Sequence, residues 1–324
     1  MTPKSGRSGS TGVGVQKGDG SSVTTIAELS SLSGQPSINN SGRVAFTSNV
    51  GGPAGREILV GDGGPLTSVL VGSSSQLGIG GPKFNDNDAI AFNDSAAISV
   101  IQGGSQTTIA TDRDADPTSP FTVLGDFSLN NTGTVSFSAL QFGGPSGIFS
   151  GDGGAISTVV DTSGIFSGFG AGPAINDSGD VAFLASLDAG GAGIFVKALG
   201  GITTIADSSG GISSFAAGPA LNDSEVVAFI AHLDVGGAGI FTGPDLTGDL
   251  VIRTGGDLFG STVASLLFSS PALNELGQIA FTATLADGRT VIARADPVAA
   301  FEPTTILLLG LGLAGLDFAR RRLH

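Results

Sequence analysis

Cysteine is absent from the 324 residues of this sequence, which excludes disulfide bonds and thiolate metal sites. Histidine is scarce, with only His232 and His324 present. A zinc site without cysteine needs several histidines, and a Ser-His-Asp triad needs one that is suitably placed. Neither site is indicated, and we interpret His232 as a packing or surface residue. The sequence therefore predicts no catalytic residue and no cofactor.

Basic residues are also few, with 14 lysines and arginines against 28 acidic residues, which gives a net charge of −14. A surface of this sign repels phosphate backbones, so the composition argues against nucleic-acid binding. It suits cations, and Ca²⁺ above all.

Glycine and β-branched residues are what the sequence has in abundance. It contains 54 glycines and 14 prolines, which indicate many turns, and 40% of its residues are hydrophobic, enough for a core. Thr, Ser, Val and Ile are plentiful, whereas helix-favouring Lys, Glu, Gln and Met are scarce. The composition favours an all-β chain.

One pattern, N-x-x-G-x-x-A-F, recurs along the chain at nearly constant spacing. The third copy has Ser136 in place of Ala, and two copies have Asp88 or Glu225 in place of Gly. The intervals between the closing phenylalanines are 46, 45, 46, 46 and 52 residues. The six copies begin at Asn39, Asn85, Asn130, Asn176, Asn222 and Asn274 and end at Phe46, Phe92, Phe137, Phe183, Phe229 and Phe281. We interpret these twelve residues as structural: the Asn shapes a turn, and the Phe fills a core.

Each unit of about 46 residues reads as three or four short antiparallel strands. In the fourth unit, strands are expected at 180–187, 193–198 and 202–206, with a short fourth strand near Phe215. Repeats of this length and strand content are typical of propeller blades. We predict a β-propeller of about six, alternatively seven, blades. A β-solenoid is the competing fold, although its coils are usually shorter.

The N-terminal end of the chain looks like half a unit. Residues 14–28 align with residues 147–161, whereas the last unit lacks its final strand. We therefore expect the N-terminal piece to complete the last sheet and close the ring, because closure removes free sheet edges. The expected domains are a disordered segment at 1–13, the propeller at 14–297 and a distinct tail at 298–324.

The tail contains an apolar stretch at 304–319, interrupted only by Asp317 and followed by three arginines. Its sixteen residues would form a helix of about 24 Å, short of a hydrocarbon core of about 30 Å but able to span a thinned bilayer. We predict a C-terminal hydrophobic, transmembrane helix. The alternative is an amphipathic or buried helix that packs on the domain.

This tail resembles a PEP-CTERM sorting signal. The resemblance rests on Glu302 and Pro303, on the Leu/Gly-rich span, and on Arg320, Arg321 and Arg322. Phe301 stands where the family usually has a first proline. The resemblance implies export, processing by a membrane exosortase, and membrane anchoring through the tail before processing.

The six repeats independently resemble the tandem N-x-x-G-x-x-A-F proteins that are called choice-of-anchor proteins. That resemblance implies surface anchoring and implies no activity. Exported proteins begin with an apolar signal segment, yet residues 1–20 contain none. We expect an upstream in-frame extension that encodes it.

Two sets of acidic residues are candidate sites. Asp112, Asp114 and Asp116 alternate as in a calcium loop, although Pro117 and Val123 depart from the EF-hand pattern. A solvated loop is the alternative. Acids at equivalent places in successive units could form a carboxylate pair for glycoside hydrolysis, but Asp at a repeated position more often caps a turn. These acids are Asp188 and Asp234, and Asp161 and Asp207.

The leading functional hypothesis is a non-enzymatic, exported, surface-anchored propeller associated with extracellular matrix or exopolysaccharide. Its expected partners are an exosortase-type enzyme, the membrane, and either exopolysaccharide or other surface proteins. A carbohydrate-active enzyme on the same fold, either a glycoside hydrolase or a lyase, is one alternative. A calcium-dependent adhesion module is another.

Overall fold

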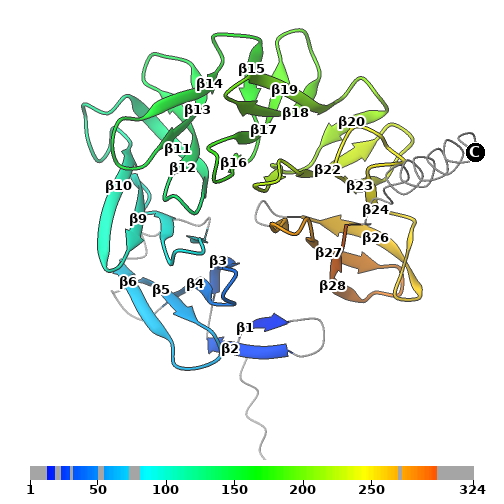
Figure 1. Cartoon of the computed structure of the whole chain (residues 1–324), viewed down its shortest axis with the longest axis horizontal. Coiled ribbons are helices and arrows are strands. Elements are labelled where there is room, and N and C mark those ends of the chain that lie inside the picture. The colour runs from blue at the N-terminus through cyan, green and yellow to red at the C-terminus, as the bar shows by residue number, and fades with distance from the viewer. Residues whose placement is uncertain are drawn as a thin grey trace, which may run out of the picture.

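A computed structural model describes residues 13–18, 23–29, 32–49, 55–72, 81–268 and 272–297. These residues form an all-β structure in which six small antiparallel sheets are arranged around an axis as the blades of a propeller (Figure 1). The predicted C-terminal helix, its sorting residues and the segment ahead of Val13 lie outside the described residues. Within the described part of the chain, no helix is long and apolar enough to cross a membrane.

Each blade contains four or five short strands that follow one another along the chain. The first blade contains β3 (Leu32–Ile38), β4 (Val44–Asn49), β5 (Arg56–Gly61) and β6 (Thr67–Gly72). The second contains β7 (Lys83–Phe84), β8 (Ile90–Asn93), β9 (Ala97–Gln102) and β10 (Ser105–Thr111), and the third β11 (Phe121–Leu129), β12 (Val135–Gln141), β13 (Ser146–Gly151) and β14 (Ser157–Asp161). The fourth contains β15 (Phe166–Phe169), β16 (Ala174–Ile175), β17 (Val181–Leu187), β18 (Ala192–Ala198) and β19 (Gly201–Asp207). The fifth contains β20 (Ile212–Phe215), β21 (Ala220–Leu221), β22 (Val227–Leu233), β23 (Ala238–Phe241) and β24 (Leu250–Arg253), and the sixth β25 (Asp257–Leu258), β26 (Ser261–Leu267), β27 (Ile279–Leu285) and β28 (Thr290–Ala295).

The repeat sets the boundaries of these strands. The three strands expected in the fourth unit are confirmed as β17, β18 and β19, which pair in sequence order with Phe183 opposite Phe195. The strand expected near Phe215 also exists, as β20, but it pairs with β22 and is the first strand of the next blade. Each of the first five blades therefore takes its inner strand from the residues ahead of its own N-x-x-G turn.

Hydrophobic cores fill the spaces between neighbouring blades. In one of them, Ile148 and Val160 of the third blade pack against Phe166, Phe183 and Phe195 of the fourth. The rings of Phe166 and Phe195 lie 5.0 Å apart in an edge-to-face arrangement, and those of Phe166 and Phe183 lie 5.6 Å apart. The interiors are thus shared between neighbouring blades.

The sixth blade differs from the others because of the longer last interval. From Arg253 to Asn274 the chain has six residues more than from Asp207 to Asn222. These residues build β25, which pairs with β26 on the side away from β27. No strand follows β28 among the described residues, so β28 is an edge of its sheet.

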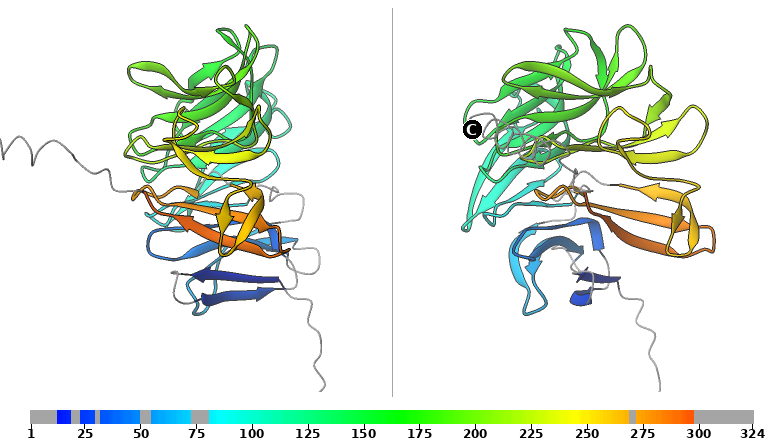
Figure 2. Two further views of the ribbon diagram at one scale, coloured as in Figure 1. Left: turned by 90° about the vertical axis from the view of Figure 1, so that its right-hand side faces the viewer. Right: turned by 45° about the vertical axis from the view of Figure 1, so that its right-hand side comes forward.

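The prediction that the N-terminal piece completes the last sheet is wrong. β1 (Val13–Gly18) and β2 (Val23–Leu29) form a separate two-stranded sheet and pair only with each other. Val15, Ile26 and Ala27 pack against Val44 and Phe46 of the first blade, and this burial holds the hairpin on that side. Figures 1 and 2 show the hairpin beside the first blade, and in Figure 1 β28 lies on the other side of the hairpin from that blade.

Candidate functional site: a polar ring at the axis

The asparagine of each repeat holds its own turn. In all six copies its Oδ1 accepts a hydrogen bond from the backbone N–H four residues later, at 2.8–3.0 Å. The fourth residue of each turn has a positive φ, which glycine adopts without strain. Asp88 and Glu225, which replace the glycine in two copies, take the same left-handed conformation, with φ of 58° and 61°.

The same asparagines also join the blades into a series. In the first five copies the Nδ2 of the Asn donates to the backbone carbonyl oxygen of the next Asn around the axis. These distances run from 2.8 Å for Asn85 to 3.5 Å for Asn176, and all five side chains are buried. We call this series the asparagine ladder. It explains why a buried polar residue recurs in the first five units, since a buried amide is costly unless it is hydrogen-bonded.

A second ring of hydrogen bonds lies one residue further along. In the first five copies, the backbone N–H of the residue after the Asn donates to the side chain at the equivalent position of the next blade, at 2.6–2.9 Å. Repeated five times around the axis, these bonds bring the six side chains to the inner turns of the blades. The members of this axial ring are Asn40, Asp86, Asn131, Asp177, Asp223 and Glu275.

The four acids of the axial ring lie close enough to affect one another electrostatically. Partial burial raises the pKa of Glu275, and the charges of Asp223, Asp177 and Asp86 raise it further, whereas the hydrogen bond from the Asp223 N–H opposes them. Carboxylates of the second, fourth and fifth blades thus raise the pKa of a carboxyl of the sixth blade, which places all four acids near the axis.

Replacing Glu275 by glutamine is expected to stabilise the protein slightly at neutral pH. The pKa of this carboxyl is higher in the folded state than in the unfolded one, so its charge costs stability above the folded pKa, and the cost disappears as the pH falls. Glutamine keeps an oxygen for the Asp223 N–H. Because the group is largely solvated, we expect a gain of only about a few tenths of a kcal/mol. Thermal unfolding of the parent protein and of Glu275→Gln at pH 7 and pH 4 measures the gain in stability. A gain that is as large at pH 4 as at pH 7 would contradict its origin in the charge of Glu275.

The predicted calcium residues lie in the loop between β10 and β11. Asp112 is buried, and its Oδ1 accepts hydrogen bonds from the N–H groups of Asp114 and Ala115, while Asp116 caps the turn at Thr118. Among the residues that the structure describes, no group of three or more His, Asp or Glu side chains could hold a metal ion. The geometry gives the calcium site no support, and it stays a prediction.

Two of the candidate glycosidase acids cap turns, as their repeated positions suggested. Asp161 accepts hydrogen bonds from the N–H and hydroxyl of Ser163, and Asp207 does the same with Ser209. These bonds lower the pKa of both carboxyls. His232 is an exposed residue of β22. None of these side chains belongs to the axial ring.

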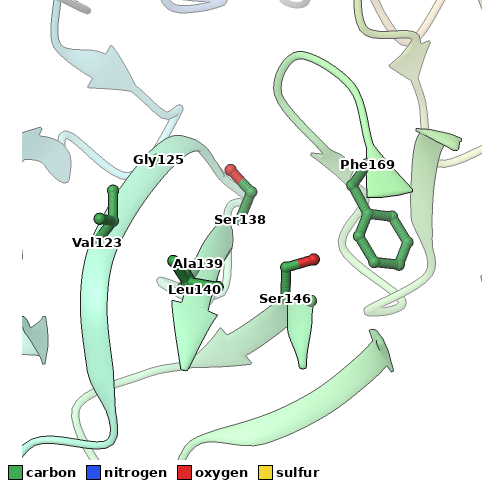
Figure 3. Close-up of a pocket in the computed structure, with 8 residues that line it drawn as sticks. Val123, Gly125, Ser138, Ala139, Leu140, Ser146 and Phe169 are labelled. Atoms are coloured by element: carbon green, nitrogen blue, oxygen red, sulfur yellow. The ribbon is translucent and has the colours of Figure 1, made fainter. Parts of the chain in front are cut away.

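A shallow pocket lies at the edge of the third blade, where it meets β15 (Figure 3). Its volume is about 180 Å³, and no charged side chain lines it. Val123, Leu140 and Phe169 supply most of its apolar wall, and Ser138 and Ser146 supply hydroxyls. Two hydroxyls without a neighbouring base do not make a nucleophilic centre.

The axial ring is the functional-site candidate that reasoning from the sequence missed. The signal was present, because an Asn, Asp or Glu follows every repeat asparagine. From the sequence we assigned a turn role to the first residue of each pair, and the hydrogen bonds of its Oδ1 agree with that role. The second residue has its partner about 46 residues away, and no local pattern shows such a contact.

The sequence matches one family over its body and one motif at its end. A family model described as "Family of unknown function (DUF7453)" matches residues 5–209 and 166–293. The PEP-CTERM protein-sorting motif matches residues 302–322. A comparison with curated proteins finds no match.

Several solved structures have a similar fold at low sequence identity. An oligogalacturonate lyase in complex with manganese has a TM-score of 0.57 at 10% identity, over 86% of this chain and 83% of that one. A puromycin-hydrolysing peptidase of Mycobacterium tuberculosis has a TM-score of 0.54 at 17% identity, over 84% of this chain. A prolyl endopeptidase has a TM-score of 0.51 at 14% identity, over 87% of this chain. This chain spans 47% and 46% of those two peptidase chains, and at such identities the likeness shows the fold alone.

Proposed function

The chain belongs to the DUF7453 family of unknown function and carries a PEP-CTERM sorting motif, and from this premise we propose that it is a non-enzymatic module of the cell surface. In this proposal the propeller is exported and held in the membrane by its tail. An exosortase then processes the tail, and the propeller remains in the extracellular matrix as a structural or binding component associated with exopolysaccharide.

The observation that carries this proposal is the position of the sorting motif. The motif occupies residues 302–322, a few residues after β28 ends at Ala295. A PEP-CTERM motif is a substrate signal for exosortase processing. The chain therefore carries a C-terminal sorting signal that directly follows the propeller.

The non-enzymatic part of the proposal rests on how the repeated polar groups are used. The asparagine ladder and the axial ring employ their amides, carboxylates and N–H groups in bonds between blades. A catalytic group must instead reach a substrate and have a pKa suited to proton transfer. The use of these side chains between blades therefore supports a structural role for them, in a module that binds a partner and does not catalyse a reaction.

Replacing Arg320, Arg321 and Arg322 together by serine is expected to prevent normal sorting. Basic residues after an apolar span keep that end in the cytoplasm, so we expect the processed surface fraction to fall by about tenfold or more. For this test, all variants are expressed in a host that carries an exosortase, with the same export signal fused ahead of Met1. Cell fractionation, with the mass of the surface protein, measures the outcome.

The matched control replaces the three arginines by lysine, which retains the charge and should sort normally. A serine variant that reaches the surface fully processed would contradict the role of the tail.

A polysaccharide hydrolase or lyase on this fold is the alternative proposal. Its support is the likeness to the lyase structure, which at 10% identity concerns the fold only. Burial lowers the pKa of Lys83 on β7, and the charge of Asp126 on β11 raises it, so this lysine is the first residue to replace if turnover is found. Turnover of an acidic polysaccharide that is lost in Lys83→Met would replace the non-enzymatic proposal.

A further inference from the structure

One boundary between blades differs from all the others. It lies between the sixth blade and β3 of the first, and we call it the seam. Gln35, Pro36, Ile38, Leu267, Ala280 and Ile292 are among the residues that line a cleft of about 440 Å³ there. The repeat makes a direct comparison possible, because each of these faces has an equivalent in the blades whose boundaries are closed.

On the sixth blade, two repeat positions are uncovered at the seam. The residue after Phe in the repeat always pairs with an isoleucine on the next strand: Ile58, Ile98, Ile148, Ile194 and Ile240 in the first five blades and Ile292 in the sixth. The first five are at most 1% exposed, whereas Ile292 is 83% exposed. The Ala before Phe shows the same contrast, because Ala182 and its equivalents are fully buried and Ala280 is exposed.

On the first blade, the facing position is uncovered as well. Ile38 directly precedes the repeat asparagine and is 57% exposed. The equivalent residues Phe84, Ile175, Leu221 and Leu273 are at most 9% exposed, and Leu129 is half-buried. Both walls of the seam are therefore built like the walls of a closed boundary, and both lack what covers them elsewhere. In the fourth blade, Ile194 is covered by Phe229 and Phe241 of the fifth.

The asparagine ladder is interrupted at the same place. Asn274 has no following blade to bond, and its Nδ2 donates to Gln278 Oε1 of its own turn at 2.8 Å. The Asn39 carbonyl oxygen accepts from the Gly42 N–H of its own turn, as in other copies, but among the described residues it receives no amide of a preceding repeat asparagine. The six turns form an open arc, with the place of one further turn left between its ends.

The hairpin of β1 and β2 occupies the outer half of this place. Residues 14–28 align with residues 147–161, which form the two outer strands β13 and β14 of the third blade. The contacts agree: Val15 and Ala27 pack on Val44 and Phe46 of the first blade, as Ile148 and Val160 pack on Val181 and Phe183 of the fourth. β13 pairs with β12 along its other edge, whereas β1 is paired only with β2.

We propose that the seam is a docking site for a β-hairpin of the chain's own repeat type, donated by a second polypeptide that carries the N-x-x-G-x-x-A-F pattern. Its two strands add to the free edge of β1 and complete a seventh blade. The six copies at residues 39–281 are already built into blades.

The chemistry of the seam selects such a hairpin. The free backbone groups of β1 require an extended strand, as in other cases of strand addition. The apolar walls at Ile292 and Ile38 require a Phe and an Ala on adjacent residues of that strand, because successive side chains point to opposite faces. The gap in the ladder requires an Asn in the turn, whose Nδ2 reaches the Asn39 carbonyl and whose own carbonyl receives the Asn274 amide.

The test measures binding of a peptide with the sequence of residues 164–187, which contains β15, β16 and β17, to the full chain. Labelled peptide and fluorescence anisotropy give the affinity. We expect saturable binding that Ile292→Asp weakens by about tenfold or more, because a charge in the closed seam would be buried without a partner. Ile292 is exposed, so this variant is expected to fold.

Two controls make the result specific. Ile202→Asp changes another exposed isoleucine, on the outer strand β19, and should leave binding unchanged. A chain with the hairpin fused ahead of Val13 should no longer bind free peptide and should unfold at a higher temperature. Absence of saturable binding, or equal binding by the Ile292→Asp protein, would overturn the proposal. So would light scattering that shows a dimer of this chain dissociated by Ile292→Asp, because the occupant would then be a second copy.

Discussion

Replacing Asn130 by alanine is expected to destabilise the propeller by about 3 kcal/mol, because each lost hydrogen bond contributes about 1 kcal/mol and an unpaired buried group costs more. Asn130 Oδ1 accepts from the Thr134 N–H at 2.9 Å and from the Thr132 hydroxyl at 2.8 Å, and its Nδ2 donates to the Asn176 carbonyl at 2.9 Å. The substitution therefore loosens the turn of the third blade and its junction with the fourth. Urea unfolding followed by circular dichroism measures the change.

Asn274 provides the matched control for this prediction. Its Oδ1 also accepts two hydrogen bonds within its own turn, from the Leu276 and Gln278 N–H groups, but its Nδ2 bonds the Gln278 side chain of that turn and no other blade. Asn274→Ala should therefore cost roughly half as much, about 1–2 kcal/mol, since only local bonds are lost. Equal losses in the two variants would mean that the ladder between blades contributes nothing measurable.

Replacing Phe183 by alanine is expected to cost about 3–5 kcal/mol, as large-to-small changes at fully buried aromatic residues do. Phe183 is 1% exposed and contacts the rings of Phe166, Phe169 and Phe195. The cavity would open between the third and fourth blades, because Ile148 and Val160 belong to the same core. Thermal unfolding would show the loss as a marked fall in the midpoint.

The comparison for Phe183 is Phe259, which is 61% exposed in the turn after β25. Phe259→Ala should change the free energy of unfolding by no more than about 0.5 kcal/mol, because the ring is already largely in water. If the two substitutions cost the same, the repeat phenylalanines would not be the residues that hold the blades together.

The repeat explains why so much of the fold could be predicted. A turn residue such as Asn176 acts on atoms two and four residues away, and a strand such as β17 shows its faces in the alternation of its side chains. Both signals are local, and six copies make them unmistakable. The three strands expected in the fourth unit followed from them.

The errors came from contacts between distant parts of the chain. The N-terminal hairpin was expected to join the last sheet because its sequence matches the back half of a unit. Its Val15 and Ala27 are indeed outer-strand residues, but they are buried against Val44 and Phe46 of the first blade. Alignment identified which half of a blade the hairpin is, and burial decided which neighbour it has.

By itself, the sequence determined the all-β class, the number of repeat units, the turn chemistry of Asn and Gly, and the sorting motif at residues 302–322, because each depends on residues close together in the chain. Only the tertiary structure decided that the amide nitrogen of the first five repeat asparagines bonds the next blade, that Asp86, Asp177, Asp223 and Glu275 gather at one axis, and that Ile292 is left without a cover. Those features depend on how far the blades turn around the axis. That rotation is set by side-chain packing between sheets some 46 residues apart, which no local pattern encodes.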